Sequence, residues 1–234
     1  MKKWQWGLVS LLGIGMVVSQ YLDFIASPPE AQMGNVVRIM YFHVASAIVA
    51  FTAFGVTAVF GVVFLLRKKW IWDQMARVSA EIGLVYTTFV LLSGSIWGDA
   101  VWNTWWTWDP TLTTTLILWF LYLAYQLLRA SIADRERAAK VASVFGLIAA
   151  VDVPIIHQSV TWWRGIHPNV ITPQGFNMPA SMVVALLFSF AVFLGLYLVI
   201  LWITTMIARD RDQLNELREQ ARNALAKYDE RTGP

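Results

Sequence analysis

The sequence contains no cysteine among its 234 residues. That absence excludes disulfide exchange, thiolate metal sites and thioether-linked cofactors on this chain. Charge is also scarce, because Asp, Glu, Lys and Arg make up only 14% of the residues, against about 25% in ordinary soluble domains. The formal net charge of +3 is too small to indicate a partner. What the chain has instead is apolar sequence, at 57% of residues, gathered into long runs between clusters of charge.

Six of these runs are long enough to span a membrane, since roughly 20 apolar residues cross a bilayer core of about 30 Å. The predicted spans are Trp6–Ala26, Val36–Leu66, Val78–Trp97, Leu112–Leu128, Val141–Ile156 and Met182–Ile207. The first is too long for a signal-peptide core of about 7–15 residues. We therefore predict an all-α, polytopic membrane protein with six transmembrane helices. Residues 1–207 form its membrane domain, and residues 208–234 form an amphipathic helical tail.

The basic residues predict the orientation, because Lys and Arg concentrate on the cytoplasmic side of membrane proteins. Sixteen of the 18 lie before span 1, between spans 2 and 3, between spans 4 and 5, or after span 6. Only Arg38 and Arg164 fall on the other side. Both termini and the tail are thus predicted to be cytoplasmic in a bacterial inner membrane. The acidic and basic residues of the tail balance, which disfavours nucleic-acid binding and leaves either a solvated helix or a docking helix.

The outward connections hold the unusual residues. Five tryptophans lie within twelve residues, more than a membrane-anchoring belt requires: Trp97, Trp102, Trp105, Trp106 and Trp108. His43 is 24 residues before Arg67, about 36 Å along a helix, and His157 is 17 residues after Lys140, about 25 Å. His167 follows in the 5–6 connection. All three histidines are therefore expected at the level of the tryptophans.

This combination suits haem, which takes imidazoles on both faces of its iron, aromatic walls for its ring and arginine for its propionates. His43 and His167 come from different segments and are the predicted iron ligands. The five tryptophans are the predicted wall, and Trp102, Trp105 and Trp108 would share one face if their stretch were helical. Arg38 and Arg164 are the predicted propionate partners.

Several residues have simpler explanations. Asp109 followed by Pro110 is typical of a helix N-cap and first position, which we favour for Asp109 over direct contact with haem. Pro154 makes a helix-end role plausible for His157, with iron ligation as the alternative. Glu81 is most simply the i, i+4 partner of Arg77. Asp152 is an intramembrane charge and therefore a functional candidate, without an assigned role.

At these residues the sequence resembles a known family. The stretch from Trp102 to Asp109, with Leu112 and Thr113, resembles the WWD domain of haem-handling proteins. The stretches Arg38–Val44 and Pro154–His157, with Trp162 and Trp163 before His167, narrow the resemblance to the CcmC family of the Ccm (system I) cytochrome c maturation machinery. One departure is Thr111, where that family usually has arginine. Contacts made by that arginine then fall to Arg38 or Arg164.

The resemblance implies a delivery scaffold without turnover of its own. Such proteins hold haem b transiently at the outer face, between two axial histidines and the WWD segment 97–110. By motif match the axial residues are His43 and His167. The implied partners are the haem chaperone CcmE, the ABC transporter of CcmA and CcmB, the small CcmD, and membrane lipid.

Other readings of the sequence are a system II, CcsA-like haem delivery protein, a haem-binding membrane anchor subunit for electron transfer, and a permease. An anchor subunit needs paired histidines inside the spans, and a permease needs polar residues through their depth. The span interiors lack paired histidines, and for a permease they offer only Asp152 and scattered Ser and Thr.

Overall fold

The computed structural model describes residues 3–163, 171–172, 175–176 and 178–232. Its helices and strands, in chain order, are α1 (Lys3–Tyr21), the π-helical η1 (Leu22–Ala26), the 3₁₀ turn η2 (Asn35–Val37), α2 (Arg38–Arg67), α3 (Trp70–Trp102), α4 (Pro110–Ser131), α5 (Arg135–Ala149), α6 (Asp152–Trp162), the two-residue strands β1 (Ile171–Thr172) and β2 (Gly175–Phe176), and α7 (Ala180–Thr232). Six helical segments are long and apolar enough to cross a membrane. This confirms the predicted all-α membrane fold; within the described ranges, only β1 and β2 pair as strands.

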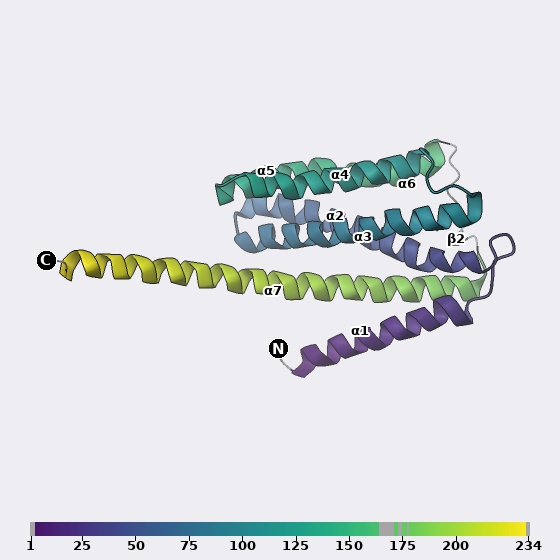
Figure 1. Ribbon diagram of the computed structural model, residues 1–234, viewed down its shortest axis with the longest axis horizontal. Coiled ribbons are helices and arrows are strands. Elements are labelled where there is room, and N and C mark those ends of the chain that lie inside the picture. The colour runs from purple at the N-terminus through teal and green to yellow at the C-terminus, as the bar shows by residue number, and fades with distance from the viewer. Residues whose placement is uncertain (1–2, 164–170, 173–174, 177, 233–234) are drawn as a thin grey trace.

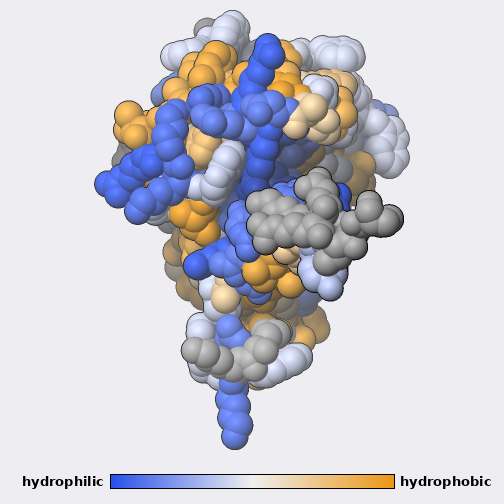
Figure 2. Space-filling model, turned by 90° about the vertical axis from the view of Figure 1, so that its left-hand side faces the viewer, coloured by the Kyte–Doolittle hydropathy of each residue, from blue (hydrophilic) through white to orange (hydrophobic). Residues whose placement is uncertain are grey.

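Both termini lie at the same end of the bundle, on the left in Figure 1. We call this the terminus end, and the opposite end, which carries residues 103–109 and Trp163, the loop end. Seen from the terminus end, hydrophilic side chains gather across the face and apolar ones lie around it (Figure 2). An even number of spans requires both termini to be at one end, and the basic residues between α2 and α3 and between α4 and α5 lie at that same end.

The centre of the bundle is α2, which packs against α3, α5 and α7. Its Phe54 stacks on Tyr122 of α4 with ring centroids 3.7 Å apart, and both side chains are fully buried. Gly83 of α3 makes this packing possible, because a Cβ there would lie 2.6 Å from Cε1 of Phe54. The closely packed α2–α3 pair supports the residues at the loop end.

A buried ion pair ties α3 to α4 near the terminus end. The guanidinium of Arg129 donates to both carboxylate oxygens of Asp73, at 2.7 and 2.8 Å. Such a bidentate pair fixes both side chains in one geometry. Nearby, Arg77 and Glu81 form the predicted i, i+4 pair at 3.9 Å.

The first helix, α1, packs mainly on α7. Close approach is allowed by Gly15, whose Cβ would lie 3.2 Å from Val192, and by Gly195, whose Cβ would lie 2.8 Å from Leu12. Small residues at a helix–helix contact are typical of membrane bundles. Near the end of α1, the buried carboxylate of Asp23 accepts hydrogen bonds from Ser189 and Ser19.

The fifth span differs from the uninterrupted run expected over Val141–Ile156. It is broken at Ala150 and Val151, where α5 ends and α6 begins. Proline lacks an N–H and clashes inside a helix, but it is tolerated in the first turn, where Pro154 lies in α6. As a result α5 packs on both α2 and α4, whereas α6 packs mainly on α4.

The predicted tail is a continuation of α7, which runs without interruption to Thr232. Asp212 joins its base to the bundle through Arg135 and Gln74. Leu214, Leu217 and Leu225 are exposed beyond that point.

Candidate functional site

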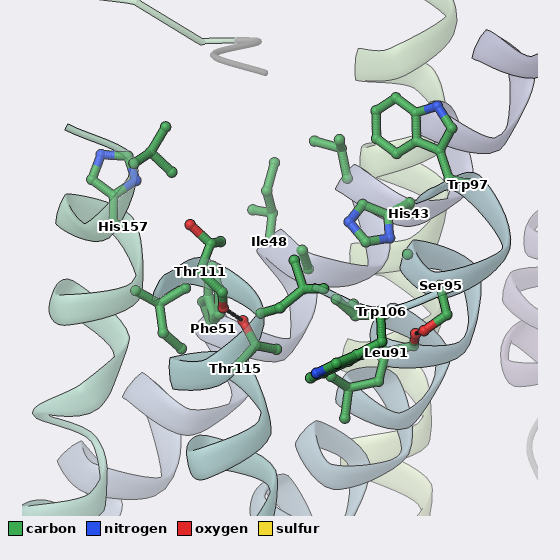
Figure 3. Close-up of a pocket in the computed structure, with 17 residues that line it drawn as sticks. His43, Ile48, Phe51, Leu91, Ser95, Trp97, Trp106, Thr111, Thr115 and His157 are labelled. Atoms are coloured by element: carbon green, nitrogen blue, oxygen red, sulfur yellow. Dashed lines mark hydrogen bonds between the residues drawn. The ribbon is translucent and has the colours of Figure 1, made fainter. Parts of the chain in front are cut away.

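A cavity of about 200 Å³ opens at the loop end (Figure 3). Its walls come from α2, α3, α4, α6 and the loop after α3. They are lined by His43, Val44, Ala47, Ile48, Phe51, Val90, Leu91, Gly94, Ser95, Trp97, Trp106, Thr111, Leu112, Thr115, Ile156, His157 and Val160. Phe51 is eight residues deeper than His43 along α2, or about 12 Å. The cavity therefore reaches from the tryptophan level into the apolar layer of the bundle.

His43 lies in the second turn of α2 and is only 7% exposed. Its Nδ1 is 3.0 Å from Oγ of Ser93 on α3. Its ring meets Trp97 edge to face, with centroids 5.7 Å apart. Gly94 leaves room for the ring, because a Cβ there would be 3.0 Å from Cε1 of His43. One turn of α3 thus holds the imidazole at the cavity wall.

Two of the five predicted tryptophans, Trp97 and Trp106, line the cavity. Both indole Nε1 atoms are buried and have no hydrogen-bond partner within the described part of the chain. An unsatisfied buried N–H costs free energy, so each is a donor that a bound ligand can satisfy.

The remaining tryptophans lie around these two. Trp102 packs on Trp97, and Trp108 packs edge to face on Trp106. Trp105 and Trp108 are 61% and 75% exposed. The helical face considered for Trp102, Trp105 and Trp108 does not form, because α3 ends at Trp102 and Asn103 adopts a left-handed conformation with φ 54°. Asparagine tolerates that conformation better than most residues, so the chain turns there into a loop.

Asp109 caps α4, as predicted. Its Oδ1 accepts hydrogen bonds from the backbone N–H groups of Thr111 and Leu112 at 2.9 and 3.1 Å, and its Oδ2 accepts from Thr107. Pro110 occupies the first helical position. The cap fixes where α4 begins and so places Thr111 and Leu112 on the cavity wall.

Thr111, at the position usually held by arginine, joins two helices. Its hydroxyl lies 2.8 Å from that of Ser159 on α6, and the side chain lines the cavity. A short neutral side chain here binds α4 to α6 and cannot provide a positive charge.

His157 lies on the wall opposite His43 (Figure 3). The helix-end role considered for it does not hold, because it lies in the middle of α6. Its side chain is exposed to the cavity mouth. The structure therefore brings His43, His157, Trp97 and Trp106 to one cavity, whereas the depth argument predicted only a common level for the three histidines and the tryptophan cluster.

Only one of the two predicted arginines, Arg38, lies in the described part of the chain. His167 and Arg164 lie outside the described residues. Arg38 is not part of the cavity wall, although its Nε is buried without a partner in the segments described. Asp152 begins α6 at the break in span 5, and its Oδ2 is likewise buried and unbonded within those segments.

Sequence reasoning missed Ser93, Gly94, Ser95 and Thr115. Helical spacing places Ser93 and Gly94 on the face of Trp97, four and three residues before it, but it does not show that they lie against His43. They were passed over because small residues carry no signal of their own.

The cavity suits a metal held inside a flat organic ring better than a bare ion. No three of the His, Asp and Glu side chains in the described segments gather into a metal site. A bare transition metal needs such a set, whereas an iron porphyrin brings four nitrogens and asks the protein for axial ligands and apolar walls.

Comparison with known proteins agrees with this geometry. Residues 1–224 match the family described as "Heme exporter protein C". A protein of that name from Haemophilus influenzae is 36% identical over 224 residues, covering 93% of this chain and 85% of its own. Those from Bradyrhizobium diazoefficiens and Escherichia coli K12 are 33% and 38% identical over 217 and 165 residues. They cover 92% and 70% of this chain and 78% and 67% of their own. The chain belongs to the CcmC, or heme exporter protein C, family.

Proposed function

We propose that this protein binds haem b at the loop end of the bundle and presents it to the haem chaperone CcmE during cytochrome c maturation. His43 is one axial ligand and His167 the other. Trp97, Trp102, Trp105, Trp106 and Trp108 form the aromatic wall around the ring. Arg38 and Arg164 are the propionate partners, and Asp109 acts through the position of α4.

The observation that carries the proposal is a buried imidazole beside a tryptophan-walled cavity. His43 is held at the wall by α3, and Trp97 and Trp106 line the same space, each with a buried indole N–H that has no partner in the described segments. Bound haem supplies an iron that accepts a nitrogen on each face. The residues present fit such a group, since they offer a nitrogen ligand, aromatic surface and hydrogen-bond donors.

The volume indicates that the cavity encloses only part of a haem. Closed ligand sites commonly measure about 300–1,000 Å³, and this cavity is about 200 Å³. Haem held here therefore has an edge outside the described walls, where a chaperone can reach it. The exposed rings of Trp105 and Trp108 extend the apolar surface for that edge.

We infer that the protein delivers haem and does not conduct it. Two of the buried hydroxyls within the spans are engaged by their own helices: Thr57 and Thr87 each donate to the carbonyl one turn earlier, at 2.9 and 2.8 Å. The clustering of basic residues at the terminus end supports a cavity on the non-cytoplasmic side of the inner membrane. Transport then falls to CcmA and CcmB, with CcmD as a further partner.

A spectrum of the purified protein tests haem binding. In detergent, the wild-type chain should show the Soret and α/β bands of a bis-imidazole b-type haem. His43→Ala combined with His167→Ala should abolish them, whereas His157→Ala is the matched control that keeps them. An unchanged spectrum in the double variant would show the ligand assignment to be wrong.

Presentation is tested separately, with the chaperone. Membranes containing this protein and CcmE should accumulate haem bound covalently to the chaperone, and His43→Ala should remove that product. Haem on the chaperone at wild-type levels despite His43→Ala would contradict a delivery role for this site.

A further inference from the structure

We propose that Ser93 is a positioning residue for His43: it accepts a hydrogen bond from Nδ1 and thereby makes Nε2 the nitrogen that coordinates iron. The inference rests on the proposed haem site and adds a residue to it from outside the family motifs. It is carried by the hydrogen bonds around one hydroxyl.

The direction of these bonds follows from a count of hydrogens. Oγ of Ser93 is 2.6 Å from the carbonyl oxygen of Phe89 and 3.3 Å from that of Val90. Carbonyl oxygens only accept, and a serine hydroxyl has one hydrogen to give. That hydrogen is committed to the backbone, so Oγ can meet Nδ1 of His43, at 3.0 Å, only as an acceptor.

This fixes the tautomer of the neutral ring. A neutral imidazole carries one N–H, and the hydrogen bond that it makes determines which nitrogen is protonated. With the proton on Nδ1, the lone pair is on Nε2. Histidines that bind metals almost always donate their other N–H to an oxygen in this way.

The same turn of α3 also fixes the orientation of the ring. Ser93 binds Nδ1, and Trp97 packs against the ring. Gly94 lies so close to the ring that a Cβ there would be 3.0 Å from Cε1. Figure 3 shows the His43 ring between Trp97 and the centre of the cavity. Turning the ring over would place a carbon against Oγ of Ser93 and lose the hydrogen bond.

The size of the effect follows from the kind of bond. Loss of such an outer partner typically lowers metal affinity by about 10–100-fold. The hydrogen bond from Nδ1–H of His43 to the Ser93 hydroxyl is one between neutral groups, as is the bond from that hydroxyl to the Phe89 carbonyl. Neutral hydrogen bonds are roughly half as strong as charge-assisted ones. We therefore expect about tenfold weaker haem binding in Ser93→Ala, at the lower end of that range.

Three variants separate the hydroxyl from its surroundings. Ser93→Ala removes the acceptor. Ser93→Thr keeps a hydroxyl on the same helix, where Thr87 and Thr88 already donate one turn back. Thr87→Val is the matched control, because it removes a hydroxyl of the same helix that donates to the Gly83 carbonyl, and Thr87 is not among the residues that line the cavity.

The measurements are the haem dissociation constant and the spin state of the ferric complex, with circular dichroism as the check on folding. Ser93→Ala should bind haem about tenfold more weakly and show a larger high-spin fraction, because the unsupported ring ligates poorly. Ser93→Thr and Thr87→Val should match the wild type in both. If Ser93→Ala matches Thr87→Val, or if Ser93→Thr is as impaired as Ser93→Ala, the hydroxyl does not position His43 and the inference fails.

Failure of the inference is distinguishable from failure of the proposed function. If His43→Ala lowers affinity and Ser93→Ala does not, haem binds at His43 without help from Ser93. If His43→Ala leaves affinity and spectrum unchanged, the site itself is wrong.

Discussion

Replacing Gly94 by alanine should weaken haem binding while leaving the fold intact. The new Cβ would lie 3.0 Å from Cε1 and 3.6 Å from Nδ1 of His43, whereas carbon contacts are optimal at about 3.5–4.0 Å. The imidazole must therefore move by roughly 0.5 Å, which is about the tolerance of a preorganised site. Overpacking of this kind costs about 1–3 kcal/mol.

Two effects of the substitution oppose each other in the unliganded protein. Alanine is favoured over glycine in a helix by about 0.8–1.0 kcal/mol, which offsets much of the overpacking. The free energy of unfolding should thus fall by no more than about 2 kcal/mol. Iron ligation requires the imidazole in its original position, so haem binding must restore the close contact with the new Cβ. Its cost of about 1–3 kcal/mol should then lower haem affinity by about five- to 150-fold, at 1.4 kcal/mol per factor of ten.

The assay is a haem titration followed at the Soret band in detergent, with thermal unfolding measured in parallel. Gly55→Ala is the matched control, because Gly55 lies on the same helix as His43 and a Cβ there meets nothing within 4 Å. It should leave affinity unchanged. Wild-type affinity in Gly94→Ala would refute the reasoning, because it would mean that His43 does not ligate from the position seen here.

Other substitutions test the frame around the site. Asp73→Ala leaves the buried charge of Arg129 without its partner and should destabilise the protein by about 3–5 kcal/mol, measured as a lower thermal midpoint. The double variant Asp73→Leu with Arg129→Met removes both charges and should recover much of this stability. Equal destabilisation in the single and double variants would show that the loss does not come from an unpaired charge. Asp109→Ala removes the α4 cap at a cost of about 1 kcal/mol, measured by denaturation, and an unchanged stability would argue against the cap. Hydrogen bonds from the N–H groups of Met33 and Gln32 lower the pKa of the exposed Glu30 carboxyl. These hydrogen bonds should stabilise the turn at neutral pH, and the stabilisation should be lost as pH falls through the lowered pKa of Glu30. The amide hydrogens of Met33 and Gln32 should therefore exchange with solvent faster in acid and, at pH 7, in Glu30→Gln. Exchange rates that change with neither pH nor the substitution, after correction for the intrinsic rate, would contradict this prediction.

Much of the fold was determined by the sequence alone. In a bilayer, every backbone N–H and C=O of a single span must be hydrogen-bonded within that span, which an α-helix achieves. Six long apolar runs therefore predict six helices. The level of His43 and of the tryptophans followed from the constant rise of a helix. The cap at Asp109 followed from local chemistry, because its acceptors and donors lie within three residues of one another.

The ends and breaks of helices were harder to predict. The third span starts at Trp70 instead of Val78 because Lys68 is left-handed and Lys69 extended, and hydropathy does not report backbone turns. The break before Asp152 separates α6 from α2, and it could be suspected from Pro154 but not located.

The arrangement of the site depended on tertiary structure. Sequence motifs indicated His43 and the tryptophans, yet they could not show that Trp97 and Trp106 line the cavity while Trp105 and Trp108 lie outside it, since a loop has no period from which to read direction. Nor could they show Ser93 and Gly94 against the imidazole, 50 residues away along the chain. Contacts between helices depend on how two surfaces rotate and pack, and that is decided by the whole bundle.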